Sequence, residues 1–297
     1  MIQSRKIRYF LAAAEHLHFS SAAASLHISQ PALSRSIRQL EERLGLPLFE
    51  RSPKGIVLTR YGELLARRAR QMQLDVEHTL AELEGIKTGS GGTLHIGAAP
   101  VWLRVFLPPL IERMQREFSN LSVDLMAGTA DTLLPALLHG KVDVLCTDLN
   151  FPTHPELDTL HLADLDFTVI AGKDHPLARK DKVEAAELLQ YPWISLRGNY
   201  SGMTRLGSYF AAQNLAPPVA RVVVSPGVGN FGFLTTGNYL TSIPTDMLEL
   251  ADRYDCVQLR LATKFWQEAA GLVYRNTHPP EAAVSAFISI VRERFDK

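Results

Sequence analysis

The chain has 297 residues, 46% of them hydrophobic and 21% charged, which excludes a disordered chain and suggests two globular domains. The formal charge is zero, but residues 1–70 carry 12 Lys and Arg against 5 Asp and Glu, whereas the remainder carries 19 against 26. This uneven charge predicts a polyanionic partner for the N-terminal part alone. With two cysteines and no apolar run of membrane-spanning length, we expect a cytoplasmic protein without a membrane partner.

The first 45 residues predict three helices. Apolar residues at positions 7, 10, 11, 14 and 17 recur at helical spacing, and a second, short helix capped by Ser20 or Ser21 follows. After a tight connection at 27–29, a third helix begins behind Ser29, with Pro31 in its first turn and Gly45 as its stop. Two helices joined in this way form a helix-turn-helix.

The third helix has an apolar stripe and a polar front. The stripe comprises Leu33, Ile37, Leu40 and Leu44. The front, off that stripe, comprises Gln30, Ser34, Arg35 and Arg38. A solvated helix usually has acids in its first turn and bases in its last. This helix reverses that order, which favours an anion near its N-terminus over an ordinary charged surface.

Residues 46–59 predict two short strands around Pro53, Lys54 and Gly55, a hairpin or wing. Thr59 then caps a helix that extends to about residue 87. Its apolar residues alternate at spacings of 4 and 3, which favours a dimerising coiled helix, with packing against its own domain as the alternative. The expected dimer contacts are Leu65, Ala69, Met72, Val76 and Leu83.

The glycine-rich stretch at 89–92 predicts a flexible joint, and beyond it strands and helices alternate. Such alternation indicates a parallel-type α/β sheet, here with enough units for two subdomains. The expected strands are 94–98, 121–127, 142–147, 167–172, 191–196, 220–225, 238–243 and 265–274. The expected longer helices are 101–118, 130–139 and 280–295.

The segment FSSAAASLHISQPALSRSIRQLEERLGLPLFERSPKGIVLTRYG at 19–62 resembles the DNA-binding signature of LysR-type transcriptional regulators. The glycine joint and the stretches GKVDVL, DHPLA and NYLTSIP are similar to the family more loosely. The matching positions in the signature are Phe19, Ala22, Ala23, Leu26, Ser29, Gln30, Pro31, Ser34, Ile37, Leu40, Glu41, Leu44, Gly45, Leu48, Phe49, Arg51, Leu58, Thr59 and Gly62.

The resemblance implies an α/β protein with an N-terminal winged helix-turn-helix, a long linker helix and a two-lobed effector domain like type 2 periplasmic binding proteins. The DNA-binding domain would cover 1–59, with the helix-turn-helix at 19–38, and the linker helix 60–88. The effector domain would cover 89–297, with lobe one at 93–162 and 267–297 and lobe two at 163–266.

The resemblance also implies that the third helix is the recognition helix, whose N-terminal turn, behind Ser29, enters the major groove of DNA. Gln30, Ser34 and Arg38 would face base edges, and Pro31 would offer an apolar contact such as a thymine methyl. The contacts to phosphates or the minor groove would come from Arg35, Arg51 and Lys54.

If the body binds a small molecule, the cleft should be lined by loops at the carboxyl ends of strands. Free amides at helix N-termini there would favour an anionic effector. Ala99 and Pro100 stand where the family often has a hydroxyl residue, which removes a donor and a backbone N–H. The candidate effector contacts are Ala99, Pro100, Val101, Trp102, Thr129, Thr147, Asp148, Ser201, Gly202, Met203, Thr204, Pro226, Gly227 and Val228.

Two other functions stay open at this point. The GxGxxG pattern at 227–232, with Asp246 beyond it, is also found in NAD(P)-linked enzymes, although Pro226 interrupts the turn and no catalytic constellation accompanies it. A solute-binding module without gene control is the other alternative. We expect no catalytic residue, metal or cofactor, and Cys146 is predicted to lie in the core.

The sequence therefore favours a sequence-specific DNA-binding regulator over an enzyme. The expected partners are operator or promoter DNA, a small effector and further copies of the chain, as a dimer through the linker helix and, by resemblance, a tetramer. RNA polymerase would be a further partner of an activator.

Overall fold

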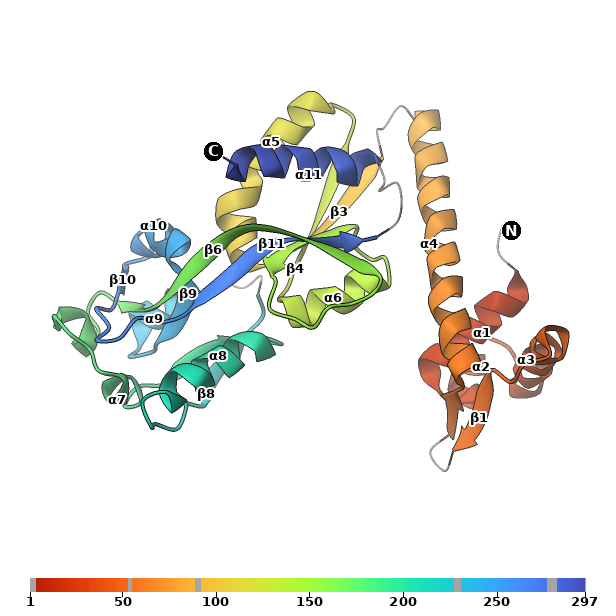
Figure 1. Ribbon diagram of the computed structural model, residues 1–297, viewed down its shortest axis with the longest axis horizontal. Coiled ribbons are helices and arrows are strands. Elements are labelled where there is room, and N and C mark those ends of the chain that lie inside the picture. Colours follow the sequence, from red (N-terminus) through yellow and green to blue (C-terminus); the bar gives the residue numbers. More distant parts are fainter. Residues whose placement is uncertain (1–3, 53–54, 89–91, 227–230, 277–281, 297) are drawn as a thin grey trace. The chain divides into compact units, whose positions relative to one another are not determined.

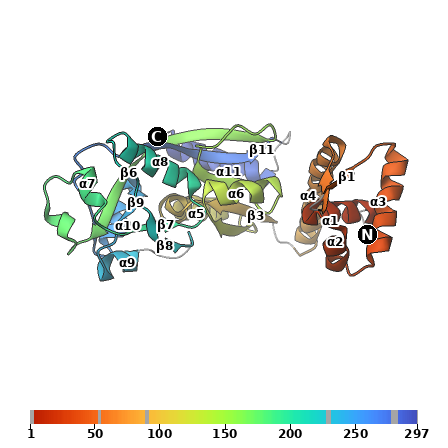
Figure 2. The same ribbon diagram turned by 90° about the horizontal axis from the view of Figure 1, so that it is seen from below.

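The computed structural model describes residues 4–52, 55–88, 92–226, 231–276 and 282–296. The chain divides into two compact units, Met1–Gly89 and Ser90–Lys297, and each has its own hydrophobic core (Figures 1 and 2). No helix within these described ranges is both long and apolar enough to cross a membrane.

The first unit is a small helical domain with a two-stranded wing and a long final helix. Figure 1 shows α1, α2 and α3 gathered around one end of α4. The two wing strands are antiparallel, with Phe49 opposite Leu58. The elements are α1 (Arg5–His16), α2 (Phe19–Ser25), α3 (Gln30–Leu44), β1 (Phe49–Ser52), β2 (Gly55–Leu58) and α4 (Arg60–Thr88).

The wing is fixed to the helices by backbone hydrogen bonds. The Glu41 carboxylate, in the last turns of α3, accepts the backbone N–H groups of Leu48 at 2.7 Å and Phe49 at 3.2 Å. The N–H of Ile56 donates to the carbonyl of Leu17 at 3.0 Å, between α1 and α2. The positions of α3 and of the wing are therefore coupled.

The ends of α3 follow the sequence prediction in part. Gly45 has a φ of +68° and donates its N–H to the Glu41 carbonyl, which confirms the glycine stop. The Ser29 side chain makes no capping bond; its carbonyl accepts from Ala32 and Leu33 instead, so the predicted hydroxyl cap is wrong. Pro31, in the first turn, lacks the amide that such a hydroxyl could otherwise bind.

Two further details of the helical unit differ from the prediction. The second helix begins at Phe19, behind His18, and not behind Ser20 or Ser21. Leu44 is 45% exposed, although the other members of its stripe are buried, because the stripe continues past the end of the core. Periodicity marks a helix face but does not show how far the packed partner extends along it.

The long helix α4 begins as predicted and is used partly within its own unit. Thr59 accepts the N–H of Gly62 at 3.1 Å with its hydroxyl oxygen, so Thr59 caps the helix. Ala69, which was predicted to contact a second copy, is 1% exposed in the core of its own unit and is not available to a partner. Leu65 packs partly against the same core, whereas Met72 is 66% exposed.

The second unit is built on a seven-stranded mixed sheet of order β10-β6-β11-β5-β3-β4, with β9 also paired to β6. Strand β3 pairs in parallel with both β4 and β5. The other described pairs of this sheet are antiparallel: β11 with β5 and β6, and β9 and β10 with β6. The strands are β3 (Thr93–Ala98), β4 (Ser122–Ala127), β5 (Val144–Asp148), β6 (Leu157–Gly172), β9 (Thr241–Pro244), β10 (Cys256–Gln258) and β11 (Gln267–Arg275).

The predicted parallel-type sheet is thus correct only around β3. The expected strand at 167–172 is the second half of the 16-residue β6, and β11 returns alongside it with Gln267 opposite Asp166 and Arg275 opposite Leu157. Antiparallel neighbours need no crossover helix, so a count of alternating elements cannot detect them. At a bulge in this pair, a Cβ on Gly271 would lie 1.9 Å from the Leu160 carbonyl oxygen.

Figure 1 shows β6 and β11 running side by side through both lobes of this unit. Lobe one holds β3, β4 and β5, and lobe two holds a separate parallel pair, β7 (Trp193–Leu196) and β8 (Ala220–Val224), beside β9 and β10. The helices are η1 (Trp102–Phe106), α5 (Leu107–Glu117), α6 (Ala130–Leu138), η2 (Pro176–Arg179), α7 (Ala185–Leu188), α8 (Tyr200–Ala211), α9 (Phe231–Thr236), η3 (Thr245–Met247), α10 (Leu248–Asp252) and α11 (Ala282–Phe295).

Candidate functional site

The front of α3 presents polar side chains to solvent. Gln30, Arg35 and Arg38 are exposed, and Ser34 is half-buried. Gln30 Nε2 lies 3.5 Å from Ser34 Oγ, the longest separation that still counts as a hydrogen bond, so the amide is nearly free. In the part of the chain that the structure describes, neither arginine forms an ion pair. These donors are available to an external anion.

The fold explains why this face is exposed. Leu33, Ile37 and Leu40 lie on the opposite side of α3 and are buried in the core of the unit. Ser29 and Pro31 are exposed at the start of the same helix, where the positive end of the helix dipole adds to the charge of the arginines. Arg51 lies in β1, but its side chain and residue Lys54 are outside the described part of the chain.

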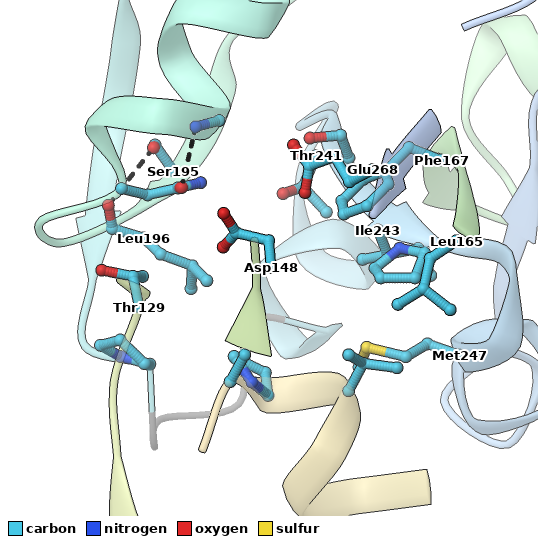
Figure 3. A pocket seen from close by; sticks show the side chains of 18 of the residues that line it. Thr129, Asp148, Leu165, Phe167, Ser195, Leu196, Thr241, Ile243, Met247 and Glu268 are labelled. Carbon is cyan, nitrogen blue, oxygen red and sulfur yellow. Dashed lines mark hydrogen bonds between the residues drawn. The ribbon is translucent and has the colours of Figure 1, made fainter. Parts of the chain in front are cut away.

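The second site is a cavity of about 130 Å³ in the effector unit, where the two lobes meet (Figure 3). It is lined by the ends of β3 and β5, the start of α6 and of α8, and parts of β6, β7, β9 and β11. The predicted effector contacts that line it are Ala99, Pro100, Val101, Trp102, Thr129, Asp148, Gly202, Met203 and Pro226.

The other predicted effector contacts do not line the cavity or are not described. Thr147 is fully buried beside Asp148, because alternate residues of β5 face opposite sides of the sheet. Ser201 and Thr204 lie on α8 but are not part of the cavity wall. Gly227 and Val228, with part of the GxGxxG pattern, lie outside the described residues.

Sequence reasoning missed the wall that lobe two and the long strands provide. Leu165 and Phe167 come from β6, Ile243 from β9 and Glu268 from β11, and Figure 3 shows them on one side of Asp148. On the other side lie Thr129, Ser195 and Leu196. The available signal was the alternation of apolar and polar residues along 165–167, but it does not reveal which face of the strand meets a cavity.

Aromatic rings form part of the cavity wall. Phe167 and Trp266 are stacked, with ring centroids 5.5 Å apart and an interplanar angle of 24°. Trp102 is completely buried and packs against Phe106 and Phe295, so it serves the core as well as the cavity. Phe167 and Trp266 therefore add aromatic, largely apolar surface to the wall.

The N-terminus of α8 does not present the free amides that the sequence predicts for the cavity. In the first turn of α8, the N–H groups of Tyr200 and Ser201 donate to Asp131 Oδ2 at 3.0 and 3.1 Å, and that of Gly202 donates to Asn199 Oδ1 at 3.1 Å. At α6 a capping box formed by Thr129 and Thr132 takes the amides of these two residues. The first amides of α8 are therefore not free for an anionic effector, because the protein's own oxygens occupy them.

Two carboxyl groups face the cavity instead. Glu268 is 7% exposed, and its Oε1 lies 3.1 Å from Nε of Arg205. Burial, together with the nearby charge of Asp148, raises the pKa of Glu268 to about 7, although Arg205 opposes the shift. Burial also raises the pKa of Asp148, and the charge of Asp131 adds to that shift while the Asn150 amide opposes it.

Both cysteines are buried. Burial raises the pKa of Cys146 well above its ordinary value, and burial with the charge of Asp255 raises that of Cys256 to about 11. The thiols therefore stay protonated and unreactive near neutral pH. The prediction that Cys146 belongs to the core is confirmed.

An exposed polar recognition helix on a winged unit, and a two-lobed unit with a cavity, define a ligand-responsive DNA-binding regulator. Two family models match the chain: "Bacterial regulatory helix-turn-helix protein, lysR family" over residues 4–63, and "LysR substrate binding domain" over residues 87–296. The chain belongs to the LysR family of transcriptional regulators. It is a DNA-binding regulator with an effector-binding domain, as its sequence predicted.

Individual relatives agree with this assignment. The chain is 27% identical over 269 residues to the uncharacterized HTH-type transcriptional regulator YybE of Bacillus subtilis (strain 168), covering 91% of each. CbnR, a LysR family regulator of known structure, shares the fold with a TM-score of 0.62 at 22% identity, covering 100% of both chains. A hydrogen-peroxide-bound variant of OxyR from Corynebacterium glutamicum is 26% identical with a TM-score of 0.57, covering 98% of this chain and 92% of that one.

These relatives are regulators and not enzymes. The alternatives of an NAD(P)-linked enzyme and of a solute-binding module without gene control are therefore wrong. A GxGxxG pattern identifies a dinucleotide site only within a matching strand-turn-helix unit. Here the pattern lies in a regulator, and within the described residues β8 before it pairs with β7 alone.

Proposed function

We propose that the front of α3 reads an operator in the major groove. Gln30, Ser34 and Arg38 contact base edges, Pro31 contacts a thymine methyl, and Arg35 contacts a phosphate. Arg51 and Lys54 of the wing add phosphate or minor-groove contacts, and Ser29 lies at the phosphate backbone. The exposure of these α3 side chains, without an ion pair for either arginine in the described ranges, supports the proposal.

The test is DNase footprinting and gel-shift titration on the DNA beside the protein's own gene. Arg38→Ala removes a contact to a base and should weaken operator binding by about tenfold to a hundredfold, with a loss of sequence choice. Arg35→Ala is the matched control: it should weaken binding to all DNA alike and reduce the salt dependence by about one counterion. Equal operator affinity and footprint in both variants and the wild type would refute the assignment.

We further propose that α4 pairs two copies into a homodimer, which assembles into a homotetramer. Met72, 66% exposed, and Leu80, 47% exposed, leave apolar surface on the helix beyond its own core, and Val76 is half-buried there. Leu83, the remaining predicted contact, has its side chain outside the described part of the chain. Pairing would place two recognition helices for half-sites about one DNA turn, roughly 34 Å, apart.

Light scattering tests this assembly. Met72→Glu should shift the full-length protein toward lower mass, because a charge would be buried in the helix pair. Glu63→Gln, an exposed position in the first turn of α4, is the control and should leave the mass unchanged. A dimer that survives Met72→Glu at micromolar concentration counts against pairing through this face.

The cavity is the proposed effector site. A small molecule that prefers one lobe arrangement would shift the population of that arrangement and so the spacing of the DNA-reading units. β6 and β11 connect the lobes, which makes them the elements that such a shift bends. Binding to promoter DNA in the cytoplasm would then alter transcription, through contact with RNA polymerase where the regulator activates.

A further inference from the structure

The two carboxyl groups of the cavity lie on one face of the sheet. Asp148, the last residue of β5, is directly opposite Ala270 of β11 in the antiparallel register. Glu268 precedes Ala270 by two residues, so its side chain points to the same face, at the diagonal position. Asp148, Glu268 and Ala270 all line the cavity, and Figure 3 shows the Asp148 carboxylate in the middle of it.

The protein supplies little positive charge to these acids. Arg205 pairs with Glu268, but Asp148 has only a weak hydroxyl contact to Thr147 at 3.4 Å and the Asn150 amide at 3.3 Å. Within the described residues Asp148 forms no ion pair. A partly buried carboxylate without a cation is unfavourable, and a ligand that brings one would relieve it.

The other charged groups nearby do not change this balance. Arg104 also lines the cavity, but the charges that act on Glu268 are those of Asp148 and Arg205, and the charge that acts on Asp148 is that of Asp131. The charged residues of the wall are Asp148, Glu268 and Arg104, and Asp131 and Arg205 act on the two acids from outside it. Asp131 is itself bound to the amides of Tyr200 and Ser201, so these two donors are not free for an added anion.

The rest of the wall suits an organic body. Leu165, Ile243 and Met247 are apolar, and the aromatic residues Phe167 and Trp266, which stack on each other, also line the cavity. A cavity of about 130 Å³ is similar in size to engineered cavities that hold a single benzene ring. Ring faces attract an organic cation as well as a hydrocarbon.

We propose that the effector is a small organic cation, an ammonium group on a body of about one ring, with the ammonium between Asp148 and Glu268 and the body against Phe167 and Trp266. This inference rests on the proposed function of the cavity as the effector site. It assigns the charge of the ligand, and it replaces the anionic effector that the sequence suggested.

The experiment uses the full-length protein at pH 7 and calorimetric titration with three compounds of equal shape: benzylamine, benzyl alcohol and benzoate. Benzylamine should bind at least tenfold more tightly than benzoate, with the alcohol between them. Asp148→Asn should weaken benzylamine binding by roughly tenfold to a hundredfold, the range for a hydrogen bond to a charged group. Asp124→Asn, an exposed position on β4, is the control and should change nothing.

Proton exchange gives a second, independent readout. Burial raises the pKa of Glu268 to about 7, so part of the protein carries this proton at neutral pH. A bound ammonium lowers that pKa, so benzylamine should release protons, whereas benzoate would take up protons. Titration in two buffers of different ionisation enthalpy measures the sign, and Glu268→Gln should abolish the release.

The outcomes test separately which charge the ligand carries and whether it binds in the cavity. Leu165→Trp fills the cavity without altering its charge. If benzoate binds more tightly than benzylamine and Leu165→Trp abolishes that binding, the cation inference fails and the effector site stands. If benzylamine does not bind, the cation inference is overturned. If benzylamine binds and neither Leu165→Trp nor Asp148→Asn changes that binding, the cation inference is overturned and the cavity is not the binding site.

Discussion

The two units carry their functional side chains in opposite ways. In the DNA-binding unit the proposed base contacts come from one helix, between Gln30 and Arg38, and they are exposed. In the effector unit the cavity wall is collected from residue 99 to residue 270, and its key acids are partly or wholly buried. A surface that one helix presents follows from local periodicity, whereas a cavity exists only where distant segments meet.

The two units also differ in whether their positive groups already have a partner within the protein. The arginines of α3 remain without an ion pair among the described residues, as a surface that awaits an external anion requires. At α8 the anion that the amides could bind is already present as Asp131. The front of α3 can therefore be interpreted from its sequence, but the amides of a helix terminus such as that of α8 can be bound by a residue far away in the chain.

The largest expected effect tests whether the two units are independent. Gly271→Ala places a Cβ 1.9 Å from the Leu160 carbonyl oxygen in the strand pair that joins the lobes, and should cost about 3 kcal/mol or more. Calorimetry should show a lower transition for the effector unit and an unchanged one for the DNA-binding unit. Gly207→Ala, in α8 with open space around its Cβ, is the control and should be neutral or slightly stabilising. A parallel fall in both transitions would contradict independent units.

A second pair of variants compares a buried and an exposed member of the apolar stripe of α3. Leu33→Ala empties a fully buried site and should lower the free energy of unfolding of the first unit by about 2–5 kcal/mol. Leu44→Ala, at a site that is 45% exposed, should cost under about 1 kcal/mol. Urea unfolding followed by circular dichroism measures both. Similar losses at the two positions would mean that Leu44 is covered in solution, for instance by another copy.

The buried acid of the cavity should make the stability of the effector unit depend on pH. The pKa of Glu268 is about 7 in the folded protein against an ordinary 4.5, so between these values the folded state binds more protons than the unfolded state. The free energy of unfolding should therefore fall as pH rises from about 4.5 to about 7, by up to about 3 kcal/mol. Denaturant titrations at pH 5 and 8 measure the fall. Glu268→Gln should remove most of it, and an unchanged fall would show that another group titrates.

The smallest expected effect concerns Asp131, the carboxylate that binds the first amides of α8. Asp131→Ala leaves the Tyr200 and Ser201 amides of α8 without their acceptor and should destabilise the effector unit by about 1 kcal/mol. Asp131→Asn retains an acceptor oxygen and should recover part of this loss. Thermal melts of the three proteins make the comparison, and full stability of the alanine variant would mean that water or a ligand replaces the carboxylate.

Particular residues show which features of the structure could be predicted from the sequence. The stops and starts of α3 and α4 follow from Gly45 and Thr59, whose roles are local and depend on neighbours within a few positions. The burial of Ala69 in its own unit could not be predicted, because a heptad pattern does not state which surface covers it. Glu268 had no signal at all, since a lone acid in a strand has no chemical meaning until its opposite strand is known.

The sequence by itself determined the family, the helix-turn-helix and the polar side chains that its third helix exposes, since these depend on spacing along one element. The tertiary structure alone decided that the sheet is mixed, that Asp131 occupies the amides of α8, and that Asp148 and Glu268 face one cavity. The physical reason is that strand register, ion pairs and hydrogen bonds join residues far apart in the chain, and their energies depend on burial that no local pattern encodes.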